Sequence, residues 1–182
     1  MPKMINFASA MNRLWQMLVW MRRWNHCRGF GIQSPTDYRF VRYVINESWP
    51  YYAYATLHPQ DHWLSRKLGQ LYLRLANELQ PHTVVDAVGV SDYLHAGCRG
   101  ASIVERPEDF DLAIVPVQYD YRPLLSHAHD GSMLVVQDIY NDRSRWKQIQ
   151  ADSRFTVTFD LYYCGIAVID QRRSPNNYIV NF

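Results

Sequence analysis

The chain has 182 residues, of which 48% are hydrophobic and 20% are charged, so it can bury one substantial core. Its formal net charge is +2 at pH 7 with the seven histidines counted as neutral, which is too balanced to require a nucleic acid or an acidic substrate. We therefore expect no nucleic-acid partner, and one globular domain (residues 63–182) preceded by a helical N-terminal extension (residues 1–62).

The cysteines indicate a reducing compartment. Cys27, Cys98 and Cys164 are odd in number and far apart, and they form no Cys-x-x-Cys pair. This pattern favours neither a disulfide framework nor a zinc site, and we expect no metal. Free cysteines are typical of proteins in reducing surroundings, so we predict a cytoplasmic location.

Residues 6–25 form the first predicted helix, and tryptophans and arginines surround its apolar side chains. A basic, Trp-rich amphipathic helix can lie in a membrane interface. We favour instead packing against the parent domain or a second subunit, as in a homodimer. The apolar run 14–21 is far shorter than the roughly 20 residues that span a bilayer. The apolar stripe recurs at three- and four-residue spacings: Phe7, Met11, Leu14, Leu18 and Met21.

Glycines and a proline at residues 28–35 interrupt the helix and predict a loop. Ser34 or Thr36 then caps a second predicted helix through residues 38–45. A third helix is predicted from Trp63 to about Gln80, because leucines recur there at helical spacing. These leucines are Leu64, Leu68, Leu71, Leu75 and Leu79.

The periodicity then changes to short, β-branched runs that are apolar on both sides, as in buried parallel strands. The predicted strands are residues 83–88, 101–105, 111–115 and 132–138. Helices predicted near residues 122–129 and 143–151 separate the later strands, which indicates a parallel sheet with crossover helices. Residues 155–161 and 164–170 predict an antiparallel pair at one sheet edge, and residues 179–180 a further short extended piece.

Several motifs then resemble one known family. Residues 29–35 read Gly-Phe-Gly-Ile-Gln-Ser-Pro, residues 67–71 Lys-Leu-Gly-Gln-Leu, residues 137–140 Gln-Asp-Ile-Tyr and residues 160–165 Asp-Leu-Tyr-Tyr-Cys-Gly. They are similar to segments of class I S-adenosylmethionine (SAM) dependent methyltransferases, in particular a bacterial O-methyltransferase-like group with a Gly-x-Gly-Ile-His-Ser-Pro leader. The resemblance implies an α/β, Rossmann-like methyltransferase fold whose mostly parallel sheet ends in an antiparallel C-terminal strand pair.

The resemblance also marks where the cofactor would bind. In the family, the first strand ends in an acid followed by a glycine-rich turn that lets the backbone approach the cofactor closely. Asp86 matches the acid and Gly89 is the glycine left in the turn, so both are candidate cofactor contacts. Val88 or Val90 stands where another glycine is expected, and we expect these branched side chains to crowd the pocket.

The second strand should end in an acid that binds the ribose hydroxyls, about 20 residues after the first acid. Glu105 stands at that distance from Asp86 and is the third candidate cofactor contact. The next strand follows it too soon for the helix and strand that the family has there, because a crossover needs about a dozen residues. We therefore predict that the edge strand, which is the third strand in the family, is missing together with its helix. In the family's numbering, the remaining strands would be ordered 2-1-4-5-7-6.

The fourth strand of the family is followed by an Asp-Gly-Asn-His segment that binds a divalent metal or orients the methyl acceptor. Here the matching residues are Pro116, Val117, Gln118 and Tyr119. Hard cations need oxygen ligands, and the proline at the position of the family's aspartate cannot coordinate one. Asp138 does match a family acid, and it is the catalytic candidate if the protein is active.

These departures favour a methyltransferase-like protein with a degenerate site, a pseudoenzyme that acts as a binding or scaffold module for an unidentified protein or small molecule. We expect no cofactor, or SAM if any. The first alternative is an active SAM-dependent methyltransferase with a small hydroxyl or nitrogen acceptor, since methyl transfer can rest mainly on positioning. The second is a peripheral membrane or oligomerising protein that acts through its N-terminal helix.

Overall fold

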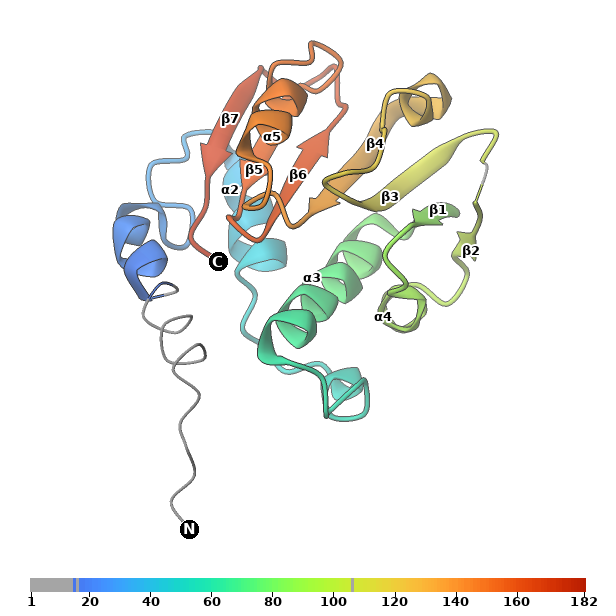
Figure 1. The fold of residues 1–182 in the computed structure, drawn as a ribbon, viewed down its shortest axis with the longest axis horizontal. Helices are drawn as coiled ribbons and strands as arrows, with labels where there is room; N and C mark the ends of the chain where they lie inside the picture. Colours follow the sequence, from blue (N-terminus) through green and yellow to red (C-terminus); the bar gives the residue numbers. More distant parts are fainter. Residues whose placement is uncertain (1–14, 16, 106) are drawn as a thin grey trace.

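The fold is a seven-stranded sheet with helices on both faces (Figure 1). The computed structural model describes residues 15, 17–105 and 107–182. Across the sheet the strands are ordered β2-β1-β3-β4-β6-β5-β7. In chain order they are β1 (Thr83–Asp86), β2 (Ser102–Ile103), β3 (Phe110–Pro116), β4 (Ala128–Gln137), β5 (Val157–Asp160), β6 (Cys164–Val168) and β7 (Asn176–Ile179).

The strand order confirms the predicted methyltransferase-like arrangement. The pairs β1–β2, β1–β3, β3–β4 and β5–β7 are parallel, whereas β6 runs antiparallel to both β4 and β5. If the missing strand is counted as the third, the first six strands follow the predicted order 2-1-4-5-7-6. β7 adds a seventh strand beyond β5, where the sequence indicated only a short extended piece at residues 179–180.

The helices cover the sheet in two layers. They are α2 (Pro35–Phe40), α3 (Trp63–Leu79), α4 (Ser91–Gly97) and α5 (Arg143–Gln150), with a π-helix η2 (Val41–Ile45) and 3-10 turns η1 (Trp24–His26), η3 (Tyr52–Ala55) and η4 (Leu124–His127). In β3, Leu112 and Ile114 join the core with α2, η2, α3 and α4, whereas Ala113 and Val115 join the core with α5. This alternation follows from the two-residue period of a strand and explains why the run is apolar on both sides.

The predicted helix at residues 63–80 is α3, and its leucine stripe faces the core: Leu68, Leu71 and Leu75 are at most 3% exposed. The side chain of His62 caps its first turn by accepting a hydrogen bond from the Leu64 amide at 3.4 Å. Gln80 ends it in the left-handed region, with φ of +46°.

The second predicted helix is also present, and Ser34 is its cap. The Ser34 hydroxyl accepts a hydrogen bond from the Asp37 amide at 3.3 Å, and Pro35 occupies the first helical position, where its missing N–H costs nothing. From Val41 the backbone widens to the π-helix η2. Val41 and Ile45 are fully buried in the same core as α3 and the sheet.

Three elements differ from the predictions. Residues 122–129 were predicted as a helix, but they form only the single turn η4, after which β4 begins at Ala128. The helix α4 between β1 and β2 has no apolar stripe long enough to identify it. It packs closely against α3 because Gly97 has no side chain to meet the Leu73 backbone carbonyl. The strand predicted at residues 101–105 contains only the two residues of β2.

The N-terminal helix is described from residue 17 to residue 22, with Trp15 also helical, and η1 follows it. Phe7, Met11 and Leu14 of the predicted stripe lie outside the described residues. Leu18 and Met21, its other members, are 47% and 53% exposed, so neither is buried against the domain. Within the described ranges, no helix is both long and apolar enough to cross a bilayer.

Candidate functional site

A cavity of about 390 Å³ lies at the carboxyl ends of β1 and β4, where α3 and α4 meet the sheet. In open parallel sheets, this edge is where ligands bind. We call it the Gly89 cavity, and its volume is within the range of small-molecule sites. The cavity is lined by His58, Asp61, Leu64, Ser65, Leu68, Tyr72, Val88, Gly89, Val90, Tyr93, Gln137 and Asp138.

The turn after β1 is organised by Asp86. Its carboxylate accepts hydrogen bonds from the backbone amides of Val88, Gly89 and Val90 at 3.0, 2.8 and 2.6 Å. Three consecutive amides that point at one carboxylate form an anion-binding nest, here filled by the chain's own side chain. Asp86 therefore holds the shape of the turn, and its oxygens are already engaged.

Gly89 borders open space. Its φ is +78°, a conformation that favours glycine, and a side-chain carbon at this position would meet no atom within 4 Å. Val88 and Val90 line the cavity but also pack against the core, where each is partly buried. The expected crowding by these two side chains therefore leaves a cavity open beside the glycine.

On the opposite wall, β4 ends in Gln137 and Asp138. The Tyr72 hydroxyl donates a hydrogen bond to the Gln137 side-chain oxygen at 2.9 Å, and the Gln137 amide reaches an Asp138 carboxylate oxygen at 3.4 Å. Burial raises the pKa of Tyr72 well above its usual value, and the nearby thiol of Cys164 and carboxylate of Asp138 add to the shift. The Tyr72 hydroxyl therefore stays protonated and remains a donor.

The backbone presents Asp138 to the cavity in an unusual conformation. Its φ is +62°, in the left-handed region, and its amide donates to the Tyr163 carbonyl at 2.7 Å. Such backbone conformations in residues other than glycine tend to occur at functional sites. Of the predicted site residues, Asp86, Gly89 and Asp138 therefore lie at one edge of the sheet, and Gly89 and Asp138 line the same cavity.

The charge of the cavity is acidic. Asp61 and Asp138 are among its lining residues, and none of the described residues that line it is a lysine or an arginine. At the rim, His58 contacts the carboxylate of Asp92 at 3.1 Å and lies 5.4 Å from the ring centre of Tyr93. A cationic group that entered this cavity would meet two carboxylates and no lysine or arginine among the described residues of its lining.

Two positions that the sequence analysis singled out, Glu105 and Pro116, lie outside the Gly89 cavity. Glu105 is exposed, beyond the end of β2, and it lies outside the lining of the Gly89 cavity. Pro116 is the last residue of β3, in register with Gln137, and the buried Val117 after it donates its amide to the Gln137 carbonyl at 2.9 Å. In the part of the chain that the structure describes, no group of three or more His, Cys, Asp or Glu side chains is placed to bind a metal.

Sequence reasoning missed several lining residues. Tyr72 lies among leucines on the buried face of α3. A buried tyrosine needs a hydrogen-bond partner for its hydroxyl, and this requirement could have identified Tyr72 from the sequence. Asp61 and Ser65 flank the start of α3 and carried no motif. Gly69 lies on α3 opposite Tyr93, whose ring occupies the space of a side chain at residue 69.

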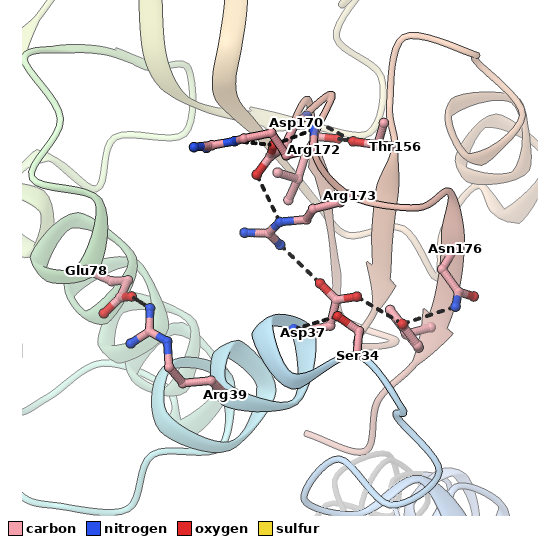
Figure 2. Close-up of polar contacts among 11 residues, drawn as sticks. Ser34, Asp37, Arg39, Glu78, Thr156, Asp170, Arg172, Arg173 and Asn176 are labelled. Atoms are coloured by element: carbon pink, nitrogen blue, oxygen red, sulfur yellow. Dashed lines mark hydrogen bonds and ion pairs between the residues drawn. The ribbon is translucent and has the colours of Figure 1, made fainter.

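A second polar cluster joins the N-terminal leader to the C-terminal strands (Figure 2). Asp37, only 2% exposed, accepts hydrogen bonds from Arg173 at 3.2 Å and from the Tyr178 hydroxyl at 2.9 Å. Arg173 also pairs with Asp170 at 3.1 Å. Because these charged groups satisfy one another, the cluster has a structural role and fastens α2 to β7.

Comparisons with known proteins add little to this geometry. No protein-family model matches the sequence, and no curated protein matches it. Among solved structures, the chain is similar to the crystal structure of the SAH-bound Podospora anserina methyltransferase PaMTH1, with a TM-score of 0.46 and 11% sequence identity. The matched region covers 77% of this chain and 97% of that chain. The methyltransferase-like fold assignment rests on the strand order described above.

Proposed function

We propose that the protein is a methyltransferase-like binding module whose Gly89 cavity takes a small cationic ligand, with SAM as the first candidate. The observation that carries the proposal is an open cavity of about 390 Å³ that Asp61 and Asp138 line at the ligand-binding edge of the sheet. SAM has a positively charged sulfonium and an ammonium group. Both would be stabilised by these carboxylates.

The site suits only part of SAM. Its open space beside Gly89 and its carboxylates fit the methionine and sulfonium end. The ribose end would have no carboxylate from β2, since Glu105 is exposed and lies outside the cavity. We therefore expect SAM to bind more weakly than it would in a complete site.

Two features support binding rather than efficient methyl transfer. β3 ends in Pro116, which supplies neither a base nor a metal ligand near the cavity. The amides of the β1–α4 turn are already bound to Asp86 and are not available to a ligand.

With its three free cysteines, the protein is proposed to act in a reducing, cytoplasmic setting.

Calorimetric titration of the full chain with SAM and with S-adenosylhomocysteine (SAH) tests this proposal. SAH lacks the sulfonium charge, so we expect it to bind about tenfold more weakly, as for the loss of one modest charge contact. Asp138→Asn should weaken SAM binding by a similar factor. The matched control Glu105→Gln should not change it, because that carboxylate lies outside the cavity.

Several outcomes would contradict the proposal. Equal affinities for SAM and SAH would remove the role of charge. Unchanged SAM binding in Asp138→Asn would place the ligand elsewhere. The absence of a binding signal at millimolar SAM would rule out SAM as the ligand of the cavity.

The second candidate is an active methyltransferase, and it is favoured by one observation: the Asp138 carboxylate lines the cavity that would hold the methyl donor. An assay of methyl transfer from labelled SAM to hydroxyl and amine acceptors tests it, and turnover should disappear in Asp138→Asn. Asp86→Ala is not a clean test, because it also removes three hydrogen bonds that shape the turn.

A further inference from the structure

The outer side of the N-terminal helix carries an exposed apolar stripe. Met17, Trp20, Met21 and Trp24 follow one another at i, i+3, i+4 and i+7, so they share one face. They are between 46% and 61% exposed, although large apolar side chains are usually buried. Trp20 and Trp24 also contact each other edge to face, with ring centres 4.6 Å apart. We call these four residues the Trp–Met stripe.

The opposite row of the helix fixes this orientation. The Trp15 indole donates a hydrogen bond to the Tyr162 hydroxyl at 2.9 Å, and Arg23 forms an ion pair with the buried Asp160 at 2.7 Å. Val19, midway between them, faces the same side and lines a pocket with Arg23 and Tyr162. Because Trp15, Val19 and Arg23 are four residues apart, this row faces the domain. Met17 and Trp20, at the edge of the Trp–Met stripe, border a cavity that Trp63 and Phe182 also line, whereas Met21 and Trp24 lie outside that lining.

The charge of the chain is divided between this region and the rest. Residues 1–36 contain five basic residues and no aspartate or glutamate, whereas residues 37–182 contain 14 basic and 17 acidic residues. Among the described residues of the first region, Arg22 and Arg28 are exposed. A positively charged region beside an exposed apolar stripe is the combination that binds anionic lipid surfaces.

We propose that this face docks onto an anionic membrane surface, with the helix lying in the plane of the interface. Tryptophan suits that environment because its ring is apolar while its N–H can reach water and headgroups. The Trp–Met stripe would enter the boundary between headgroups and acyl chains, and Arg22 and Arg28 would contact lipid phosphates. This proposal is independent of the ligand proposed for the Gly89 cavity.

The width of the stripe favours a membrane over a second copy of the chain. A stable protein interface usually buries about 800 Å² on each partner and involves some 20 to 30 residues a side. Within the part of the helix that the structure describes, the stripe is a single face of four large side chains. An interfacial helix needs only a narrow apolar face and adjacent cations, which is what this region provides.

Flotation of the full chain with vesicles tests the proposal. We expect binding to vesicles that contain phosphatidylglycerol and little binding to pure phosphatidylcholine vesicles. The double variant Met21→Glu/Trp24→Glu should bind the anionic vesicles at least about tenfold more weakly. Trp49→Glu is the matched control, because Trp49 is 75% exposed but lies outside this helix, and its binding should be unchanged.

A second arm tests the charge. Arg22→Glu/Arg28→Glu should weaken binding by a comparable factor and reduce its dependence on salt. Binding that is equal in the wild type and in both double variants would overturn the proposal, as would failure to bind anionic vesicles. A dimer in analytical ultracentrifugation that Met21→Glu/Trp24→Glu dissociates, without any vesicle binding, would assign the stripe to a second copy instead.

Discussion

The two ends of the sheet are built differently. At one end, β2 contains only two residues, and the chain passes directly to β3 without a further strand. At the other end, β7 adds a strand beyond β5 (Figure 1). Buried carboxylates there bind the N-terminal region to the sheet. The β2 end of the sheet is reduced, and the β7 end is elaborated.

The elaborated end centres on Asp160, which is 2% exposed. Its carboxylate pairs with Arg23 and Arg143, and it also accepts a hydrogen bond from the Trp146 indole at 3.1 Å. Burial alone would raise the pKa of Asp160, but the hydrogen bond from Arg143 and the charge and hydrogen bond of Arg23 outweigh burial and lower it. The pair with Arg23 connects the N-terminal helix to the end of β5.

The Asp37 cluster of Figure 2 repeats this pattern on the next strand. Burial and the hydrogen bond to Asp37 raise the pKa of Tyr178 to about 12, so the hydroxyl keeps its proton and donates to Asp37. Two separate buried carboxylates thus bind the N-terminal region to the C-terminal strands. This chain therefore places its buried charges where they hold the N-terminal region, and it has few of them at the β2 end of the sheet.

The largest effect should follow from Asp160→Ala, which removes the partner of two arginines. Breaking a buried ion pair from one side typically costs about 3–5 kcal/mol, because the remaining charge is left without compensation. Urea unfolding followed by circular dichroism measures the change. Asp152→Ala is the control, since Asp152 forms its ion pair with Arg154, which is 47% exposed, and it should cost about 1 kcal/mol or less. Similar losses in both variants would refute the importance of the elaborated end.

Gly97→Ala tests the reduced end. A methyl group at Gly97 would overlap the Leu73 carbonyl of α3, so α4 must move, at a cost of about 1–3 kcal/mol. Thermal or urea unfolding measures it. Gly100→Ala is the matched control, because a side chain there meets no atom within 4 Å, and its stability should be close to wild type. A neutral Gly97→Ala would mean that α3 and α4 are not closely packed.

Lowering the pH should reduce the free energy of unfolding, partly through Asp160. Because the pKa of this carboxyl is lower in the folded state, its contribution is present above the unfolded value near pH 4 and is lost as the pH falls through the folded value. Asp160→Asn should therefore flatten the fall in unfolding free energy below about pH 4, by at most about 1.4 kcal/mol per pH unit. Urea titrations at pH 7, 4 and 3 measure it, and parallel curves for the wild type and Asp160→Asn would contradict it.

The smallest effect is expected for Arg39→Ala, which breaks the ion pair with Glu78 between α2 and α3 (Figure 2). The Arg39 side chain is 59% exposed, so solvent screens the pair and its loss should cost about 0.5 kcal/mol or less. Chemical unfolding measures it. A loss above 2 kcal/mol would show that α2 depends on surface pairing rather than on its buried residues.

The sequence predicted the parts of the fold that periodicity controls. The leucine spacing of α3 and the β-branched runs of β1, β3 and β4 identified these elements, because each buries a regular pattern of side chains. The short link after Glu105 also predicted the missing strand. Periodicity could not identify α4 or separate η4 from a helix, because neither is long enough to show a repeat.

The candidate site could be predicted only in part. Asp86, Gly89 and Asp138 were candidates because the resembled family has an acid and a glycine-rich turn after the first strand and an acid at the position of Asp138, and they lie at the edge of the sheet where ligands bind. That the Asp86 carboxylate binds three amides of its own turn depends on backbone angles that no spacing reveals. Glu105 stood at the expected distance along the chain, yet it lies outside the cavity.

The sequence alone determined the short apolar strands and the absence of an acid after β3, because these follow from local patterns of apolar residues and from residue identity at strand ends. The order of the first six strands was implied by the resemblance to methyltransferases, and it is the order found. Only the tertiary structure decided that a cavity stays open beside Gly89, that its lining is acidic, and that the side chains of the Trp–Met stripe are exposed. Those properties arise where segments far apart in the chain meet. Charge and exposure there depend on several elements at once.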